Sequence, residues 1–370
     1  MSPAKYLVKI HLNFENHQNE NLEIQSNMKL IMQDITFFSS PTGLGHVTRD
    51  SAIIEYLQNF QTKFVTGAAA TTFLKQCGFD VEDAYSPPKF VVENGLLQHP
   101  VKWLWQYYKY YKECKNISSD IIKNEKPRVI VSDEDFASLT IAQEQNIPSV
   151  LITDVLETRF TRGLASLIEK KMNRSMQEII KKCDTVIMPE EGSNEDNISR
   201  VGPIIRSTNC SREELRKKFS FDKKTIVVSV GGTDAGKFLI EKTFEVYKKI
   251  KDDVELIIVA GPSLDKDYLK NTRNLGFVNN LHEIIFAADL IVSLAGKSTI
   301  DESKGYGTPG IFIPIKNHFE QEDNAKEEGF SYEDINKLDS LINKKLEEKR
   351  NPHNYDGAKK AADLINKFLK

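Results

Sequence analysis

The fragment "VVSVGGTDAGKF" contains the residue types of a phosphate-binding loop. Gly231, Gly236 and Lys237 fit the pattern G-x-x-x-x-G-K after an apolar run, but Phe238 stands where a Ser or Thr hydroxyl should hold Mg²⁺. The fragment therefore lacks the metal ligand of a nucleoside triphosphatase. It still predicts a tight turn between a strand and a helix, where free backbone N–H groups favour a phosphate.

A second fragment, "SLAGKST", carries the same signal with a different defect. Gly296, Lys297, Ser298 and Thr299 fit the end of the pattern, but Ile291 stands where its first glycine belongs. Either turn alone is also explained by the tight geometry that glycine allows in many folds. Two such turns in one half of the chain predict a site for a phosphate group.

Two acids follow the second turn. Asp301 and Glu302 lie on the first turn of the helix that "AGKST" opens. A carboxylate there can accept hydrogen bonds from both hydroxyls of a ribose. The alternative is that Asp301 only compensates the positive end of the helix dipole.

The first half of the chain has its own glycine turn, "PTGLGHVTR". Gly43 and Gly45 precede a helix that has His46 on its first turn and Arg49 one turn later. Thr48 replaces the third glycine of a dinucleotide-binding turn and no acid ends the next strand, so a dinucleotide site is disfavoured. We expect the helix dipole to lower the pKa of His46, which keeps the ring neutral and able to accept a proton. The alternative is a histidine that only bonds a neighbouring loop.

The segment "SDEDF" places Asp133 and Asp135 at the end of an apolar run. Asp-x-Asp holds a metal in some enzymes, but it is among the least specific of patterns. Acids at the carboxyl end of a strand in a doubly wound sheet face the ligand crevice. We therefore expect a substrate contact here and no metal.

Aromatic residues alternate with lysines in the run "VKWLWQYYKYYKECK". Such a mixture over residues 101–112 is typical of a surface that contacts lipid or a membrane interface. The alternative is a helix packed on the sheet, because Trp103, Tyr107 and Tyr111 share one stripe at i, i+4 and i+8. The sequence leaves both interpretations open.

Composition describes an ordinary water-soluble protein of two domains. The chain has 370 residues, with 40% hydrophobic and 28% charged residues, and 50 basic against 53 acidic residues give a net charge of -3. This balance gives no reason to expect nucleic acid as a partner. The four cysteines form no C-x-x-C pair, so neither disulfides, a zinc site nor another cofactor is expected. No apolar run is long enough to span a membrane and no signal peptide is evident, which predicts a cytoplasmic protein.

Apolar runs alternate with helical segments along most of the chain, which predicts α/β domains with doubly wound parallel sheets. Ser211 and Glu214 form a capping box that starts one helix of the second series. Four divisions follow: an N-terminal extension over 1–33, a first domain over 34–202, a second over 203–354, and a last helix over 355–370 that we expect to cross back onto the first domain.

The run "ADLIVSLAGKSTIDESKGYGTPGIFIPIKNHFEQEDNA" resembles the donor-binding signature of the GT-B glycosyltransferases, in particular the MurG-like group and its archaeal relatives. The resemblance covers nearly the whole chain from residue 34. It implies two Rossmann-like domains that face each other across a cleft. The first would be the acceptor side, and the second would bind a nucleotide-sugar donor.

The resemblance also implies roles for single residues. "GLGH" corresponds to a loop beneath the donor diphosphate, so His46 falls where a catalytic or diphosphate-contacting histidine is expected. Arg206 matches an interdomain arginine near the diphosphate, and Glu302 and Gln321 match the residues that hold ribose and sugar hydroxyls. Lys297 departs from the family, in which this position is small or aromatic. The implied donor-binding residues are Gly43, Gly45, Arg206, Gly232, Thr233, Gly296, Lys297, Ser298, Thr299, Glu302, Gln321 and Asn324.

The implied activity is a metal-independent, inverting transfer of a hexosyl or N-acetylhexosaminyl group. UDP is the expected nucleotide, and the acceptor is a hydroxyl of a lipid-linked molecule, a glycan or another compound at the inner face of the membrane. His46 is the expected base, with Asp133 or Asp135 as competitors. A nucleotide-sugar 2-epimerase of the same fold and a non-catalytic nucleotide-sugar-binding protein are the alternatives.

Overall fold

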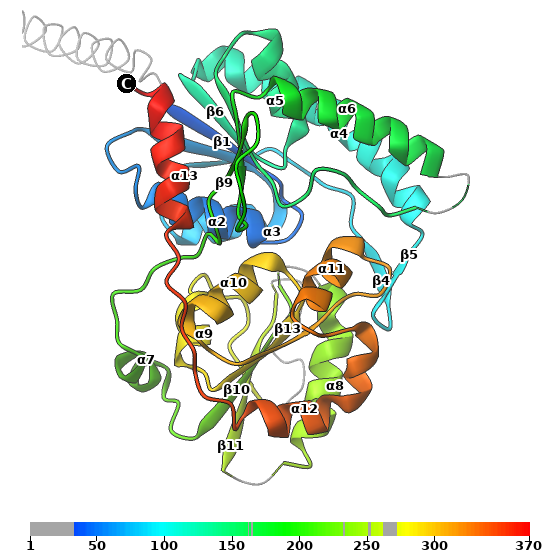
Figure 1. The fold of residues 1–370 in the computed structure, drawn as a ribbon, viewed down its shortest axis with the longest axis vertical. Helices are drawn as coiled ribbons and strands as arrows, with labels where there is room; N and C mark the ends of the chain where they lie inside the picture. Colours follow the sequence, from blue (N-terminus) through cyan, green and yellow to red (C-terminus); the bar gives the residue numbers. More distant parts are fainter. Residues whose placement is uncertain (1–32, 162, 164–165, 232–233, 251–252, 262–271) are drawn as a thin grey trace, which may run out of the picture.

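The structure, a computed structural model, describes residues 33–161, 163, 166–231, 234–250, 253–261 and 272–370. The predicted extension therefore lies outside the described residues, apart from Gln33. Two α/β domains stand one above the other, and the last helix returns to the upper one (Figure 1). The predicted pair of doubly wound parallel sheets is confirmed.

The first domain is built on a seven-stranded sheet in which every pair of neighbours is parallel. In spatial order the strands are β3 (Val81–Asp83), β2 (Thr62–Thr66), β1 (Ile35–Ser39), β6 (Val129–Asp133), β7 (Ser149–Ile152), β8 (Thr185–Met188) and β9 (Ile198–Arg200). All five residues of β1 and of β6 are buried, as expected for central strands with helices on both faces. The sheet order brings the carboxyl ends of β1, β6 and β7 together.

Helices cover both faces of this sheet (Figure 1). They are α2 (Gly45–Ile54), α3 (Ala68–Gln76), α4 (Pro100–Glu125), α5 (Phe136–Glu144) and α6 (Ser166–Lys182). The helix α4 contains the aromatic run and packs mainly against α5. The predicted packed stripe of aromatic side chains on α4 is present: Trp103 is buried and stacks on Tyr107, with ring centroids 5.1 Å apart.

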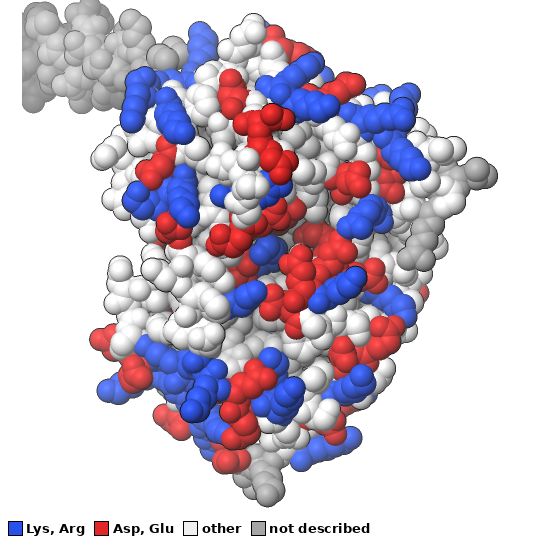
Figure 2. Space-filling model, viewed as in Figure 1, with Lys and Arg blue, Asp and Glu red and all other residues white. Residues whose placement is uncertain are grey.

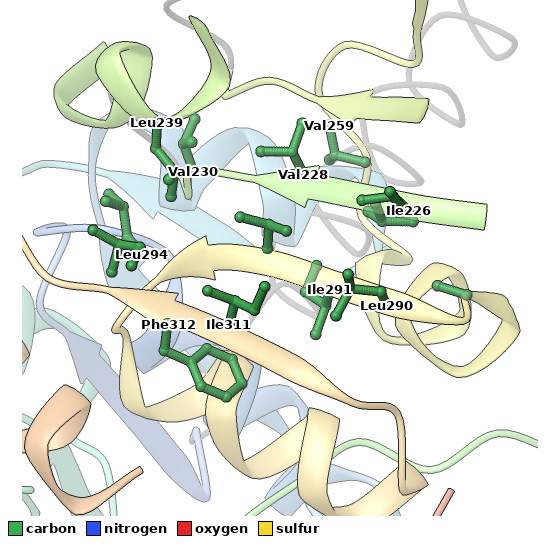
Figure 3. Close-up of a cluster of buried hydrophobic side chains, with 14 of the residues drawn as sticks. Ile226, Val228, Val230, Leu239, Val259, Leu290, Ile291, Leu294, Ile311 and Phe312 are labelled. Atoms are coloured by element: carbon green, nitrogen blue, oxygen red, sulfur yellow. The ribbon is translucent and has the colours of Figure 1, made fainter. Parts of the chain in front are cut away.

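The second domain has a parallel five-stranded sheet. Its spatial order is β12 (Arg273–Asn274), β11 (Val254–Val259), β10 (Lys224–Ser229), β13 (Leu290–Leu294) and β14 (Gly310–Ile313). Figure 3 shows how Ile226 and Val228 of β10, Ile291 of β13 and Ile311 of β14 form the centre of one hydrophobic core. Burial of these β-branched side chains on both faces is the main source of this domain's stability.

Six helices surround the second sheet in the part of the chain that the structure describes. They are α7 (Arg212–Phe219), α8 (Lys237–Tyr247), α9 (Leu281–Ala287), α10 (Lys297–Tyr306), α11 (Phe319–Glu327) and α12 (Leu338–Lys345). The capping box predicted for the first of them is confirmed: Ser211 accepts a hydrogen bond from the Glu214 amide, and the Glu214 carboxylate accepts one from the Ser211 amide.

Two segments cross between the domains. The last helix, α13 (Gly357–Ile365), packs against α2, and Ala361 and Ile365 are fully buried in the core of the first domain. In the other direction, the two-stranded hairpin of β4 (Val91–Glu93) and β5 (Leu96–Gln98) leaves the first domain and lies on the second. Only the first of these crossings was predicted from the sequence.

Candidate active site

A cleft of about 1160 Å³ separates the two domains and is lined by both. On the face drawn in Figure 2, acidic side chains gather where the domains meet, with a few basic ones among them. Most of the predicted site residues line this cleft. They are Gly43, Gly45, His46, Arg206, Gly296, Lys297, Ser298, Thr299, Glu302 and Gln321. The predicted Gly232 and Thr233 lie outside the described residues.

The glycine turn before α2, at Gly45, and the one before α10, at Gly296, meet directly across the cleft. The Ser298 hydroxyl, on the first turn of α10, donates a hydrogen bond to the Gly45 carbonyl, on the first turn of α2, over 3.1 Å. A Cβ atom on Gly45 would lie 3.1 Å from the Ser298 hydroxyl oxygen, so the approach leaves little room for any other residue. Helices α2 and α10 therefore begin side by side, and His46 lies beside the start of α10.

A buried charge network forms the wall of the first domain. The His46 imidazole lies 2.7 Å, Nδ1 to Oδ1, from the Asp133 carboxylate, which is fully buried at the end of β6. Arg49 donates from Nε and Nη2 to the same carboxylate, each over 2.5 Å, and from Nη1 to Asp154 at the end of β7. The Arg49 guanidinium holds the pKa of Asp133 below its ordinary value although burial opposes this, so Asp133 stays ionised.

The pKa of His46 differs from the sequence-based expectation. Burial alone would lower it, but the charge of Asp133 and its hydrogen bond, helped by Glu134, raise the pKa of His46 to about 9. The prediction that the helix dipole keeps this pKa low is therefore wrong. A carboxylate in direct contact outweighs the partial charge of a helix end. Asp133 also fixes which ring nitrogen is protonated, since an Nδ1–H donated to Asp133 leaves Nε2 for a substrate.

The next two residues of the "SDEDF" segment have different surroundings. Glu134 lines the cleft with a left-handed backbone, φ 57°, and its carboxylate accepts hydrogen bonds from the Thr153 hydroxyl and the Asp154 amide. A non-glycine residue in this conformation at the end of a strand is typical of functional sites. Asp135 instead turns away from His46, because its side chain caps α5 through the Ser138 amide and accepts from the Tyr85 hydroxyl. The structure thus gives Asp135 a role in folding.

The wall of the second domain contains two ion pairs. Lys297, at the start of α10, contacts Asp301 with 2.6 Å between Nζ and Oδ1. Arg206 and Glu302 are both buried, and the guanidinium donates to both carboxylate oxygens over 2.7 and 3.2 Å. Helix α10 begins at Lys297, so Asp301 and Glu302 lie on its second turn and not on its first.

Gln321 and Asn324 serve the backbone around the cleft. The Gln321 side-chain carbonyl accepts a hydrogen bond from the Ile315 amide over 3.0 Å, which folds the loop between β14 and α11. The Asn324 amide donates to the Ala295 carbonyl over 3.2 Å, just before the turn that starts α10. Asn324 does not line the cleft, so it supports the glycine turn before α10 from behind.

Two acids that line the cleft were missed by the sequence analysis. Asp154 lies two residues after the end of β7, and Asp133 is the last residue of β6, so the rule that acids at the carboxyl ends of strands face the crevice applies to both. Glu320 lies on the first turn of α11, directly before Gln321. Burial and the charges of Glu134 and Asp154 raise the pKa of Glu320 to about 8, so its carboxyl group is mostly protonated at neutral pH.

An apolar groove continues the cleft between α4 and α6. Phe90, Trp103 and Tyr107 form a stack, with Phe90 and Trp103 centroids 4.4 Å apart, and Phe160 closes one side. The outer rim carries large exposed apolar side chains, of which Trp105 is 65% exposed. The others are Val101, Tyr108, Leu167 and Ile168. The aromatic run therefore has one packed face and one face open to solvent.

Across the described ranges, no group of three or more His, Cys, Asp or Glu side chains has the arrangement of a metal site. Within the same residues, every helix is too short or too polar to cross a bilayer.

Comparisons with known proteins agree with this architecture. Residues 225–367 match the family model described as Glycosyltransferase family 28 C-terminal domain. An "Uncharacterized glycosyltransferase" of Methanosarcina acetivorans is 25% identical over 325 residues, which cover 80% of this chain and 84% of that protein. The UDP-N-acetylglucosamine--N-acetylmuramyl-(pentapeptide) pyrophosphoryl-undecaprenol N-acetylglucosamine transferase of Desulforamulus reducens is 25% identical over 61% of this chain and 63% of its own length.

Solved structures show the same fold at low sequence identity. The glycotransferase of kitacinnamycin has a TM-score of 0.66 at 14% identity and covers 91% of this chain and 99% of its own. The UDP-GlcNAc 2-epimerase of Methanocaldococcus jannaschii, solved with UDP-GlcNAc and UDP, has a TM-score of 0.57 at 13% identity and covers 90% and 99%. Both likenesses establish the fold and leave the activity to other observations.

These findings define a GT-B fold in which residues 225–367 match the glycosyltransferase family 28 C-terminal domain. The chain is similar to archaeal glycosyltransferases and to a MurG-type N-acetylglucosamine transferase.

Proposed function

We propose that this glycosyltransferase moves a hexosyl or N-acetylhexosaminyl group from a UDP-sugar to an acceptor hydroxyl, with inversion. The observation that carries the proposal is the meeting of the two glycine turns, where the Ser298 hydroxyl contacts the Gly45 carbonyl. At this point the start of α10, which we take as the phosphate site of the donor, lies beside His46 of the first domain. A base and a leaving-group site within one cleft are what glycosyl transfer requires.

The donor would lie along the start of α10. The free N–H groups of its first turn favour a diphosphate, and Lys297 adds a positive charge beside them. Glu302 keeps acceptor capacity on both carboxylate oxygens after pairing with Arg206, so it can also accept the ribose hydroxyls. Gln321 and Glu320, on the facing loop, would contact the sugar. This set stabilises a departing nucleoside diphosphate with helix dipole and side-chain charge.

His46 would be the base. In the neutral form of His46, which becomes populated as pH approaches its pKa of about 9, Asp133 holds the Nδ1–H and the Nε2 atom can take a proton from the acceptor hydroxyl in the transition state. Asp133 would then stabilise the imidazolium that forms, as the carboxylate of a catalytic triad does. Asp133 itself is a poor base, because Arg49 and His46 hold it ionised and hydrogen-bonded.

The acceptor would be a lipid-linked or similarly amphiphilic molecule whose hydroxyl reaches His46. The apolar groove between α4 and α6 opens into the cleft, and its exposed rim residues suit the interface of a membrane. The protein would then act in the cytoplasm, in peripheral contact with the inner face of the membrane through residues 101–112. A 2-epimerase or a nucleotide-sugar binder would have no use for such a groove.

Nucleotide binding tests the proposal. The purified protein is titrated calorimetrically with UDP, GDP, ADP, dTDP and their common sugar conjugates. Tight binding of one nucleotide and of a sugar conjugate of it supports the donor site and names the donor for acceptor screens. Absence of heat with the whole panel, together with unchanged melting temperatures, would contradict it.

A further inference from the structure

The hairpin of β4 and β5 belongs to the first domain by sequence and to the second by contacts. Leu97 is 4% exposed and packs into the hydrophobic core of the second domain. The Leu97 amide donates to the Lys316 carbonyl over 3.0 Å, and the Lys316 amide donates to the Gly95 carbonyl over 2.8 Å. The Tyr332 hydroxyl donates to the Asn94 carbonyl over 2.6 Å. The hairpin is therefore fixed to the second domain by backbone and side chain together.

The hairpin binds residues 315–321, which comprise the end of the loop after β14 and the first turn of α11 and are called loop 315–321 from here on. Lys316 belongs to this loop, and Gln321 folds it by accepting from the Ile315 amide. His318 caps α11 by accepting from the Gln321 amide, and its ring lies 5.3 Å from Phe90, just before the hairpin. The conformation of the loop thus depends on a segment of the opposite domain.

The hairpin also continues into the apolar groove. Helix α4 begins at Pro100, two residues after β5 ends at Gln98. Phe90 stacks on Trp103 of α4, and the Trp103 indole donates to the Pro88 carbonyl over 3.1 Å. One stretch of chain therefore contacts both the groove and the loop that carries Glu320 and Gln321.

We propose that the β4–β5 hairpin is a positioning element that holds loop 315–321 in the conformation that binds the sugar of the donor. The inference rests on the proposed function, because it takes Glu320 and Gln321 as sugar contacts. The nucleotide has separate supports, since Glu302 is held by Arg206 and α10 by its contact with Gly45. A displaced hairpin should therefore weaken the sugar-dependent part of donor affinity and spare the nucleotide-dependent part.

Gly95 offers a specific way to displace the hairpin. Its φ is +78°, and an added Cβ would lie 2.7 Å from the Tyr332 ring and 2.9 Å from the Phe238 ring. In the variant Gly95→Ala the hairpin and these two rings cannot keep their present places together, so the contact between hairpin and second domain must change. Gly78 provides a matched control, because its φ is +83° and its Cβ would meet nothing within 4 Å. Gly78→Ala carries the same kind of backbone strain without the clash.

The test is calorimetric titration of each variant with UDP and with the UDP-sugar that the wild type binds most tightly. Gly95→Ala should bind the UDP-sugar about fivefold or more weakly and UDP within about twofold of the wild type. Gly78→Ala should bind both like the wild type. If Gly95→Ala does not fold, Tyr332→Phe, which removes only the bond to Asn94, should show a smaller loss for the UDP-sugar alone.

Three results would overturn the inference. One is wild-type affinity of Gly95→Ala, or of Tyr332→Phe where it replaces that variant, for the UDP-sugar. The second is an equal loss for UDP and the UDP-sugar, which would indicate general damage to the second domain. The third is a wild type that binds neither UDP nor any UDP-sugar, which would remove the proposed function and this inference with it.

Discussion

The two walls of the cleft hold their charges differently. On the wall of the first domain, His46, Arg49, Asp133 and Asp154 are joined in one network around a fully buried carboxylate. The wall of the second domain has two separate ion pairs beside a helix start, and of these Lys297 keeps about a fifth of its side chain exposed at 22%. The first wall is fixed before any substrate arrives, whereas the second has groups that a ligand can share or recruit.

Under the proposed function, this difference suits separate tasks for the two domains. A fixed network suits proton transfer, because the base must keep its orientation and its pKa throughout the reaction. Ion pairs next to free backbone N–H groups suit an anionic ligand, which replaces or extends the existing contacts. Changes on the first wall should therefore act on turnover, and changes on the second wall on donor affinity.

His46→Ala is the largest expected effect. Loss of the base should lower kcat by about 10² to 10⁴-fold, while the dissociation constant of the UDP-sugar stays within about twofold. UDP release in the presence of acceptor measures kcat, and calorimetry measures the dissociation constant of the UDP-sugar. Turnover that survives the substitution would show that another group is the base and would remove the contrast between the walls.

Glu302→Gln is the smaller effect, on the opposite wall. The amide keeps an acceptor for Arg206 and so avoids leaving a buried guanidinium without a partner, which Glu302→Ala would do. Donor affinity should fall about tenfold, because one charged acceptor for the ribose is lost. Turnover at saturating donor should change much less. A loss in kcat with unchanged affinity would place Glu302 in the chemistry and not in binding.

The sequence predicted what local pattern can encode. The glycine turns before α2 and α10, the helix start at His46 and the capping box at Ser211 depend on neighbours within a few residues, and the structure has them where the sequence places them. The placement of both sheets follows from the alternation of apolar runs and helices. Asp154 could also have been predicted, because it follows the carboxyl end of β7 by two residues, close to where Asp133 ends β6.

The sequence did not predict what depends on strand order. The pKa of His46 is set by Asp133, which lies 87 residues away and reaches it because β6 pairs with β1. The hairpin has a local signal, the Asn94-Gly95 turn between two apolar pairs, but its place on the second domain is a tertiary contact. The prediction of a low pKa for His46 was wrong because it considered only the helix dipole and missed Asp133, which the pairing of β6 with β1 brings into contact.

The pH dependence of kcat/KM tests the central claim, that His46 is a base whose pKa Asp133 sets. The measured reaction is UDP release from the UDP-sugar by wild type and Asp133→Asn, with Asp301→Asn as a control that removes a carboxylate from the other wall. With a pKa of about 9, His46 gains its base form as pH rises, so wild-type activity should rise up to about pH 9. Asp133→Asn should move this rise to lower pH, and Asp301→Asn should leave it in place. Activity that falls as pH rises through 9, or a rise that does not move in Asp133→Asn, would contradict the account.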